Sequence, residues 1–107
     1  MKTYLLIETR SRWESGEVQG FLGLAKDLAS AGERVDLLLI QNGVLISRDL
    51  AAIADLMDTS AATMWADDVS LAVRGIAADQ VPNGIRVAGM KRIIGLMTRP
   101  DCKTVWH

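Results

Sequence analysis

The sequence of 107 residues is poor in the residues that build disulfides and metal sites, with one cysteine, Cys102, and one histidine, His107. A single cysteine cannot form an internal disulfide, and no group of cysteine and histidine residues has the spacing of metal ligands. We therefore expect no metal and no cofactor. A free thiol fits a reducing compartment, the cytoplasm. A lone histidine at the end of the chain, without a positioned nucleophile, is assigned no role.

Long apolar runs and runs of one charge are also missing. No segment approaches the roughly 20 apolar residues that cross a bilayer, so no membrane partner is expected. The apolar run after Met1 is too short for a signal peptide and is stopped by Glu8. Twelve basic and 13 acidic residues give a net charge of −1 without a basic cluster, so nucleic acid is not expected to bind directly. The composition, with 50% hydrophobic residues, excludes a disordered chain and predicts a single domain over residues 1–107.

Short apolar runs alternate with amphipathic stretches, a rhythm typical of an α/β protein with a mostly parallel sheet. Five strands are predicted, over residues 3–8, 34–40, 62–66, 85–88 and 103–106. Between them, apolar residues at helical spacing predict four helices. The sets expected to face inward are Val18, Phe21, Leu22, Ala25, Leu28 and Ala29; Leu50, Ile53, Ala54 and Met57; Val69, Ala72, Val73 and Ile76; and Met90, Ile93, Ile94 and Met97. Asp49 and either Asp67 or Asp68 are candidate helix caps, and Gly32 stands where the first helix closes.

Two polar loops fall where parallel strands would end, which is where ligands gather in open α/β sheets. The first loop precedes a helix, whose free backbone N–H groups favour an anion. A phosphate or sulfur oxyanion could be held by eight residues: Thr9, Arg10, Ser11, Arg12, Ser15 and Gly16 of the first loop, with Asn42 and Gly43 of the second. The competing interpretation is structural, with Ser15 as a helix cap and Asn42-Gly43 as a plain turn.

Cys102 is the one thiol, so any persulfide chemistry confined to this chain must use it. Arg99 and Lys103 are its neighbours in the sequence and would favour the thiolate if their side chains approached it. The alternative is that Cys102 is a small, partly buried apolar residue at the start of the last strand.

Some apolar residues lie off the helix stripes or beside polar loops, which leaves apolar surface for a partner and predicts an oligomer. The residues expected to face that partner are Trp13, Leu24, Leu45, Ile46 and Trp65.

Three stretches of the sequence, in order, resemble one known family. Residues 35–44 read VDLLLIQNGV, residues 65–76 begin WADDV and continue with AVRGI, and residues 103–106 read KTVW. They resemble the DsrE/DsrF/DsrH family of small sulfur-relay proteins, the last two stretches its DsrH/TusB branch. The resemblance implies a three-layer α/β/α sandwich, oligomers built from homologous subunits, and persulfide sulfur passed between cysteines. Family members that carry sulfur place their cysteine in or near the first helix or after the third strand, where this chain has Phe21, Leu22, Leu24 and Asp67-Asp68.

Two functional hypotheses follow. The first is an oligomeric binding or scaffolding subunit for sulfur trafficking, with persulfide transfer through Cys102 and with homologous subunits or a sulfur-carrier protein as partners. The second is a small-molecule or nucleotide/anion-binding α/β module that uses residues 9–16 and no redox chemistry. A sulfur adduct on Cys102 distinguishes the two, because only the first hypothesis needs the thiol.

Overall fold

A computed structural model describes residues 1–58 and 62–107. Its five strands form one sheet in the order β4-β3-β2-β1-β5. The strands are β1 (Thr3–Glu8), β2 (Arg34–Leu39), β3 (Ala62–Asp67), β4 (Ile85–Ala88) and β5 (Cys102–Trp106). Each of the four pairings between them is parallel. The predicted five-stranded parallel sheet is therefore confirmed.

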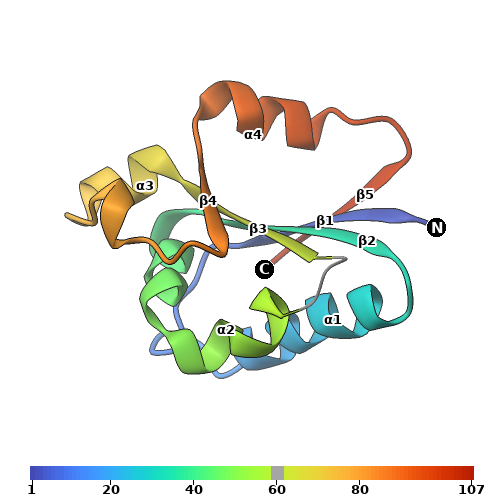
Figure 1. The fold of residues 1–107 in the computed structure, drawn as a ribbon, viewed down its shortest axis with the longest axis horizontal. Helices are drawn as coiled ribbons and strands as arrows, with labels where there is room; N and C mark the ends of the chain where they lie inside the picture. The colour runs from blue at the N-terminus through green and yellow to red at the C-terminus, as the bar shows by residue number, and fades with distance from the viewer. Residues whose placement is uncertain (59–61) are drawn as a thin grey trace.

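Helices cover both faces of the sheet (Figure 1). On one face lie α1 (Val18–Ser30) and α2 (Leu50–Met57), and on the other lies α4 (Met90–Met97). The strand order explains this arrangement. The chain moves in one direction from β1 to β4 and then returns past β1 to β5, so right-handed crossovers bring its helices to opposite faces. The result is the predicted three-layer sandwich.

Three short helical segments complete the chain. The short helix α3 (Asp68–Val73) follows β3 directly, and two 3-10 helices, η1 (Gln41–Arg48) and η2 (Ala78–Gln80), follow β2 and α3. The sequence predicted only a turn where η1 lies. No helix in residues 1–58 or 62–107 is long and apolar enough to span a membrane.

The core has two parts, one on each face of the sheet, because successive side chains of a strand point to opposite faces. The larger cluster packs Leu37 and Leu39 of β2 against α1 and α2, and the smaller one packs Leu38 against α4. The inner strands are therefore apolar at consecutive positions, as strands covered on both faces are. Two charged residues break this rule, since Glu8 and Asp36 are buried within the strands.

The predicted inward face is right for α1 and only partly right for the three shorter helices. In α1, Val18, Phe21, Leu22, Ala25 and Ala29 are buried and Leu28 is partly buried. Leu50, Ala54 and Met57 of α2, Val69, Ala72 and Val73 of α3, and Met90, Ile94 and Met97 of α4 are instead exposed. A helix of six to eight residues rests on the sheet with about two side chains. The predicted Ile53, Ile76 and Ile93 are buried, and residues outside the predicted sets are buried with them: Leu56, Ser70, Leu71 and Leu96.

The predicted helix ends are partly right. Asp67 caps α3, where its carboxylate accepts the backbone N–H of Ser70 at 3.0 Å. Gly32 follows the end of α1 with φ +90°, a conformation that favours glycine. Asp49 precedes α2 but makes no capping hydrogen bond. Its carboxylate is instead paired with the guanidinium of Arg12.

Candidate functional site

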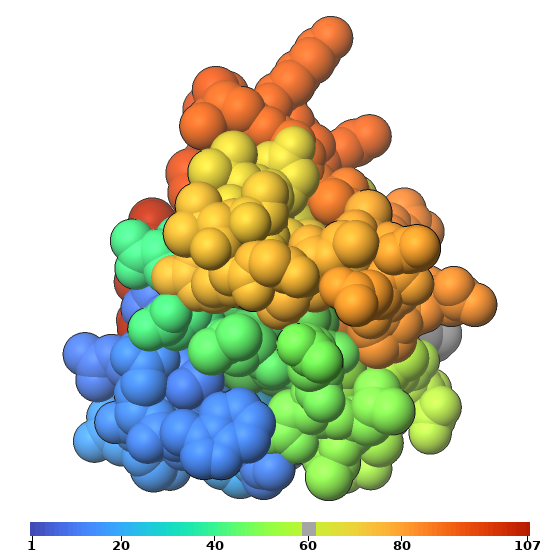
Figure 2. Space-filling model, turned by 90° about the vertical axis from the view of Figure 1, so that its left-hand side faces the viewer, coloured from blue at the N-terminus to red at the C-terminus, as the bar shows by residue number. Residues whose placement is uncertain are grey.

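The loop predicted to hold an anion lies, with η1 and α3, at the edge where the parallel strands end (Figure 2). The negative group that this loop binds is a carboxylate of the chain itself, that of Glu14. The Glu14 carboxylate accepts the backbone N–H of Ser11 at 2.7 Å and the side-chain amide of Asn42 at 3.1 Å. These two hydrogen bonds lower the pKa of Glu14, the bond from Ser11 having the larger effect. The donors expected for an external ligand are therefore used within the loop.

Three further side chains of this loop are also paired internally, while the side chain of Arg10 is exposed. Thr9 Oγ1 donates to the backbone carbonyl of His107 at 2.8 Å, and Ser15 Oγ accepts the N–H of Glu17 at 3.1 Å. The guanidinium of Arg12 makes two contacts to Asp49, of 2.5 and 2.9 Å. Ser15 is therefore not the predicted cap of α1, because Glu17 is the N-cap and has no side-chain capping hydrogen bond. Ser11 is buried.

Gly43 has a structural reason to be glycine. It is buried, and a Cβ at this position would lie 2.1 Å from the backbone carbonyl oxygen of Glu8. Any side chain would therefore push η1 away from the end of β1. Asn42 beside it is held from two sides, by Glu14 and by the guanidinium of Arg74 at 2.9 Å. Both residues close this edge of the sheet, and an anion would have to displace an existing contact.

His107, which the sequence left without a role, is packed into the molecule. Its Nδ1 lies 2.7 Å from the Glu8 carboxylate, which is fully buried, and its ring stacks on Phe21 with centroids 5.2 Å apart. Its backbone N–H donates to the carbonyl of Ile7, and its carbonyl accepts from Thr9. The sequence assigned His107 no role, but in the structure it fastens the end of β5 to β1 and α1.

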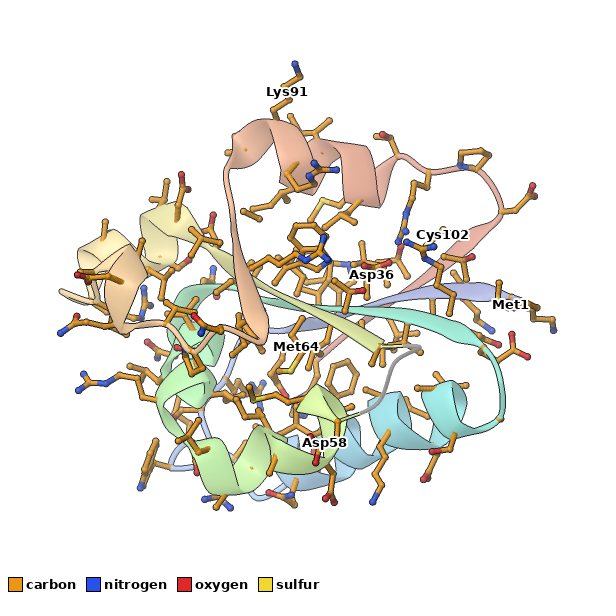
Figure 3. All side chains as sticks on the ribbon, viewed as in Figure 1. Met1, Asp36, Asp58, Met64, Lys91 and Cys102 are labelled. Carbon is orange, nitrogen blue, oxygen red and sulfur yellow. The ribbon has the colours of Figure 1, made fainter. Side chains whose placement is uncertain are left out.

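Cys102 lies at the opposite edge, because it is the first residue of β5. Figure 3 shows Cys102 and Asp36 on the side of the sheet that faces α4, toward the end of the molecule where Met1 lies. The thiol is partly exposed, and Nη2 of Arg99 donates to its sulfur at 3.4 Å. The structure therefore separates Cys102 from the predicted anion loop. It brings the thiol to one of the two cations that the sequence suggested.

A buried carboxylate holds Arg99 in this position. Asp36 is 1% exposed, and its two oxygens accept from different residues. Oδ2 accepts from Nη1 of Arg99 at 2.8 Å, and Oδ1 accepts from the indole Nε1 of Trp65 at 2.8 Å. A chain of contacts thus runs from Trp65 through Asp36 and Arg99 to the sulfur of Cys102. The guanidinium of Arg99 can stabilise negative charge on the sulfur of Cys102.

Asp36 was not among the predicted site residues, although the sequence carries a signal for it. Asp36 is the one charged residue between Val35 and Ile40, in a strand that is otherwise apolar. A carboxylate in a strand covered on both faces must be paired, because burying an unpaired charge is costly. That argument predicts a cationic or hydrogen-bonding partner for Asp36 but does not say which residue it is.

The five residues expected to face a partner divide into two groups. Trp13 and Leu24 are 76% and 40% exposed, so both are available at the surface. Ile46 is fully buried in the larger core cluster, and Leu45 is partly buried against it. Trp65 is buried on the other face, beside Asp36. Ile46 and Trp65 are therefore corrected to residues of the chain's own core, because η1 and β3 turn them inward.

The fold defines the class of protein as a parallel α/β sandwich with the strand order β4-β3-β2-β1-β5. Two solved structures are similar to it. YchN from E. coli matches with a TM-score of 0.81 at 13% identity, over 98% of this chain and 100% of that one. MTH1491 from Methanobacterium thermoautotrophicum, a protein of unknown function, matches with a TM-score of 0.77 at 16% identity, over 99% of this chain and 98% of that one. No protein-family model matches the chain, and no curated protein does.

The likeness to YchN confirms the predicted fold class, a three-layer α/β/α sandwich with a parallel five-stranded sheet. At 13 and 16% identity the likeness concerns the fold alone. The DsrE/DsrF/DsrH family, its DsrH/TusB branch and its sulfur chemistry stay predictions.

Proposed function

We propose that this chain is a sulfur-trafficking protein of the DsrE/DsrF/DsrH kind, an oligomeric binding subunit that accepts sulfur on Cys102 in a reducing compartment such as the cytoplasm. The observation that carries the proposal is the 3.4 Å contact between the Arg99 guanidinium and the sulfur of Cys102. Asp36 fixes that guanidinium from the other side. A partly exposed thiol beside a fixed cation has the surroundings of a reactive cysteine.

The proposed step is a transfer of sulfane sulfur. The Cys102 thiolate attacks the terminal sulfur of a persulfide donor, a new S–S bond forms, and the S–S bond of the donor breaks. The electron pair of the broken bond leaves with the donor as its thiolate, so Cys102 becomes a persulfide without net oxidation. Attack by the thiolate of a downstream carrier then returns Cys102 to its starting state. Arg99 stabilises the negative charge on sulfur before and after each transfer.

The experiment is to incubate the protein with a small persulfide donor and to measure its intact mass. We expect a species heavier by one sulfur atom that is absent in Cys102→Ser. Arg99→Gln should slow its formation about tenfold, as expected for loss of one charge-assisted hydrogen bond. Lys103→Gln is the matched control. It also removes one positive charge beside Cys102, but Lys103 is exposed and makes no hydrogen bond to the sulfur. A wild-type protein that takes up no sulfur overturns the proposal.

Partners of the proposed function are homologous subunits, either further copies of this chain or related chains, and a sulfur-carrier protein. The exposed indole of Trp13 and the exposed Leu24 support an apolar contact on the α1 side of the molecule. Sedimentation of the protein at micromolar concentration tests the assembly. An oligomer that dissociates in Trp13→Ser supports it, and a monomer at every concentration overturns it.

The second hypothesis, an anion-binding module that uses residues 9–16, has less support. The donors of that loop already bind Glu14, and Arg12 is paired with Asp49. An anion there would compete with two carboxylates of the chain itself. A different region of the molecule offers unpaired cations.

A further inference from the structure

We propose that the cavity between α4 and the sheet binds a small anion with two negative charges, and that this anion is the form in which sulfur or its carrier molecule reaches Cys102. The second half of the proposal rests on the proposed function. The first half, the binding of a dianion, stands on the cavity itself.

Four arginines line this cavity, namely Arg34, Arg86, Arg92 and Arg99. They come from β2, β4, α4 and the loop after α4, so the fold gathers them from four parts of the chain. The strand register explains the positions of two of these arginines and of Asp36. Arg86 lies opposite Trp65 across the β3–β4 pair, and Arg34 and Asp36 are two residues apart on β2, which puts them on the same face. The cavity measures about 390 Å³.

The charges of the cavity do not balance. Asp36 is the one carboxylate in its lining, so four arginines and one aspartate leave a net charge of +3. Asp36 is already engaged by Arg99 and Trp65. No carboxylate in the described residues lies within salt-bridge distance of Arg34, Arg86 or Arg92. The chain as a whole carries −1, so this region is opposite in sign to the rest of the molecule. Like charges gathered in one cavity repel one another, and a bound dianion would relieve that repulsion.

Trp65 orients two of the guanidiniums. Those of Arg86 and Arg92 lie 5.5 and 5.4 Å from the centre of its ring, within the range of a cation–π contact. This contact uses the face of a guanidinium and leaves its N–H groups free. In the described chain neither side chain makes a hydrogen bond to protein. A guanidinium has five donors and no acceptor, so donors held in this way suit an oxygen-rich anion.

The size of the cavity and its place limit the ligand. Sites for small molecules run from about 300 to 1,000 Å³, and this cavity, at about 390 Å³, is near the lower end. A tetrahedral oxyanion or a small organic molecule with two acidic groups fits that class. Arg99 belongs both to the cavity and to the contact with Cys102. An anion bound by Arg99 would therefore lie on the α4 face of the sheet, one guanidinium away from the thiol.

The test is calorimetric titration of the whole protein with inorganic phosphate and, separately, with thiosulfate. Each is added to about 10 mM at constant ionic strength, since salt screens exposed charges. Chloride at equal ionic strength is the reference. We expect both dianions to bind. The double variant Arg86→Gln, Arg92→Gln should weaken binding at least tenfold, and the control double variant Arg10→Gln, Arg48→Gln should change it less than twofold. Arg10 and Arg48 are exposed and lie outside the cavity.

Three results would overturn the cavity site: no binding of either dianion above the chloride reference, equal weakening in both double variants, or binding that survives in Arg86→Gln, Arg92→Gln. Because that double variant removes both cation–π contacts with Trp65, Arg34→Gln serves as a second test variant. It should weaken dianion binding severalfold and leave both contacts with the Trp65 ring in place.

Cys102→Ser separates this inference from the proposed function, since it keeps all four arginines and should bind phosphate as wild type does. If dianions bind but Cys102 takes up no sulfur, the proposed function fails and the cavity site stands. If Cys102 takes up sulfur from an uncharged donor but no dianion binds, the cavity site fails and sulfur transfer stands.

Discussion

Replacing Asp36 by alanine is the most direct probe of how the structure supports its thiol. The substitution removes the acceptor of two hydrogen bonds, each 2.8 Å long. Its cost follows from what the partners can do afterwards. The indole N–H of Trp65 lies in a residue that is 8% exposed, so it stays without an acceptor, which costs about 1–3 kcal/mol. The side chain of Arg99 is 25% exposed and can turn toward water, so its lost charge-assisted bond counts for less than the usual ~1.5–3 kcal/mol.

Asp36→Ala also removes a destabilising requirement, because the buried carboxylate no longer has to be desolvated on folding. This effect raises the free energy of unfolding, since desolvating a charge opposes folding. We therefore expect Asp36→Ala to lower the free energy of unfolding by about 3 kcal/mol, less than the simple sum of ~4 kcal/mol from the middle of the two ranges. Asp36→Asn keeps an acceptor for Trp65 and loses only the charge that faces Arg99. Its cost should be about 1–2 kcal/mol.

Urea unfolding, followed by far-ultraviolet circular dichroism, measures these differences. Asp27→Ala is the control, because Asp27 is exposed on α1 and its loss should change stability by less than about 0.5 kcal/mol. Equal stability of Asp36→Ala and Asp27→Ala would refute the reasoning. So would an Asp36→Asn variant that is as unstable as Asp36→Ala, since the cost would then not depend on the hydrogen bond from Trp65.

Three further predictions concern the carboxyl-terminal edge of the sheet. Gly43→Ala should cost about 2–3 kcal/mol in urea unfolding, because its Cβ would meet a backbone oxygen of Glu8 at 2.1 Å. Gly20→Ala, with no atom within 4 Å of the new Cβ and a position inside α1, should instead add about 1 kcal/mol. His107→Ala should cost about 2 kcal/mol, because the buried Glu8 carboxylate loses its contact with the imidazole, and an unchanged midpoint would show that the contact contributes nothing. The lowered pKa of Glu14 means that its hydrogen bonds stabilise the fold fully above the ordinary range of a glutamate, about 4.3, and that this contribution is lost as the pH falls through the lowered pKa. Unfolding midpoints of wild type and Glu14→Gln should therefore converge on acidification, and a constant difference would contradict this account.

The inner strands of the sheet were predictable because they are buried on both faces. Such strands show as unbroken apolar runs, and β1 begins and ends at the predicted residues. The edge strand β4 also has its predicted bounds, although its two middle residues are exposed. The faces of the short helices were not predictable from spacing alone. In α4 the exposed set of Met90, Ile94 and Met97 follows helical spacing as well as the buried pair does. Only contact with the sheet selects between them, and the sequence does not contain that contact.

The candidate site was less predictable than the fold, for a physical reason. Arg99 and Asp36 are 63 residues apart in the sequence, and Trp65 is 29 residues from Asp36. Only the order of the strands brings them together. The sequence alone indicated Cys102 and suggested Arg99 as its neighbour, because those two residues are close in the chain. A rule that every charged residue in a buried strand requires a partner would have added Asp36.

The two edges of the sheet differ in what they leave free. At the carboxyl-terminal edge, where the general rule for open α/β sheets predicts a ligand, Glu14 binds the loop donors and Gly43 packs against Glu8. On the α4 face, in the cavity that reaches toward the amino-terminal edge, the balance is reversed, since four arginines share the single carboxylate of Asp36, and one of them, Arg99, contacts the thiol. Unsatisfied charge, rather than the position of loops, therefore locates the site. Folding tolerates Arg34, Arg86 and Arg92 in one cavity, none of them paired with a carboxylate of the described residues, at a cost in repulsion. A cost of this kind is expected where a bound anion compensates it.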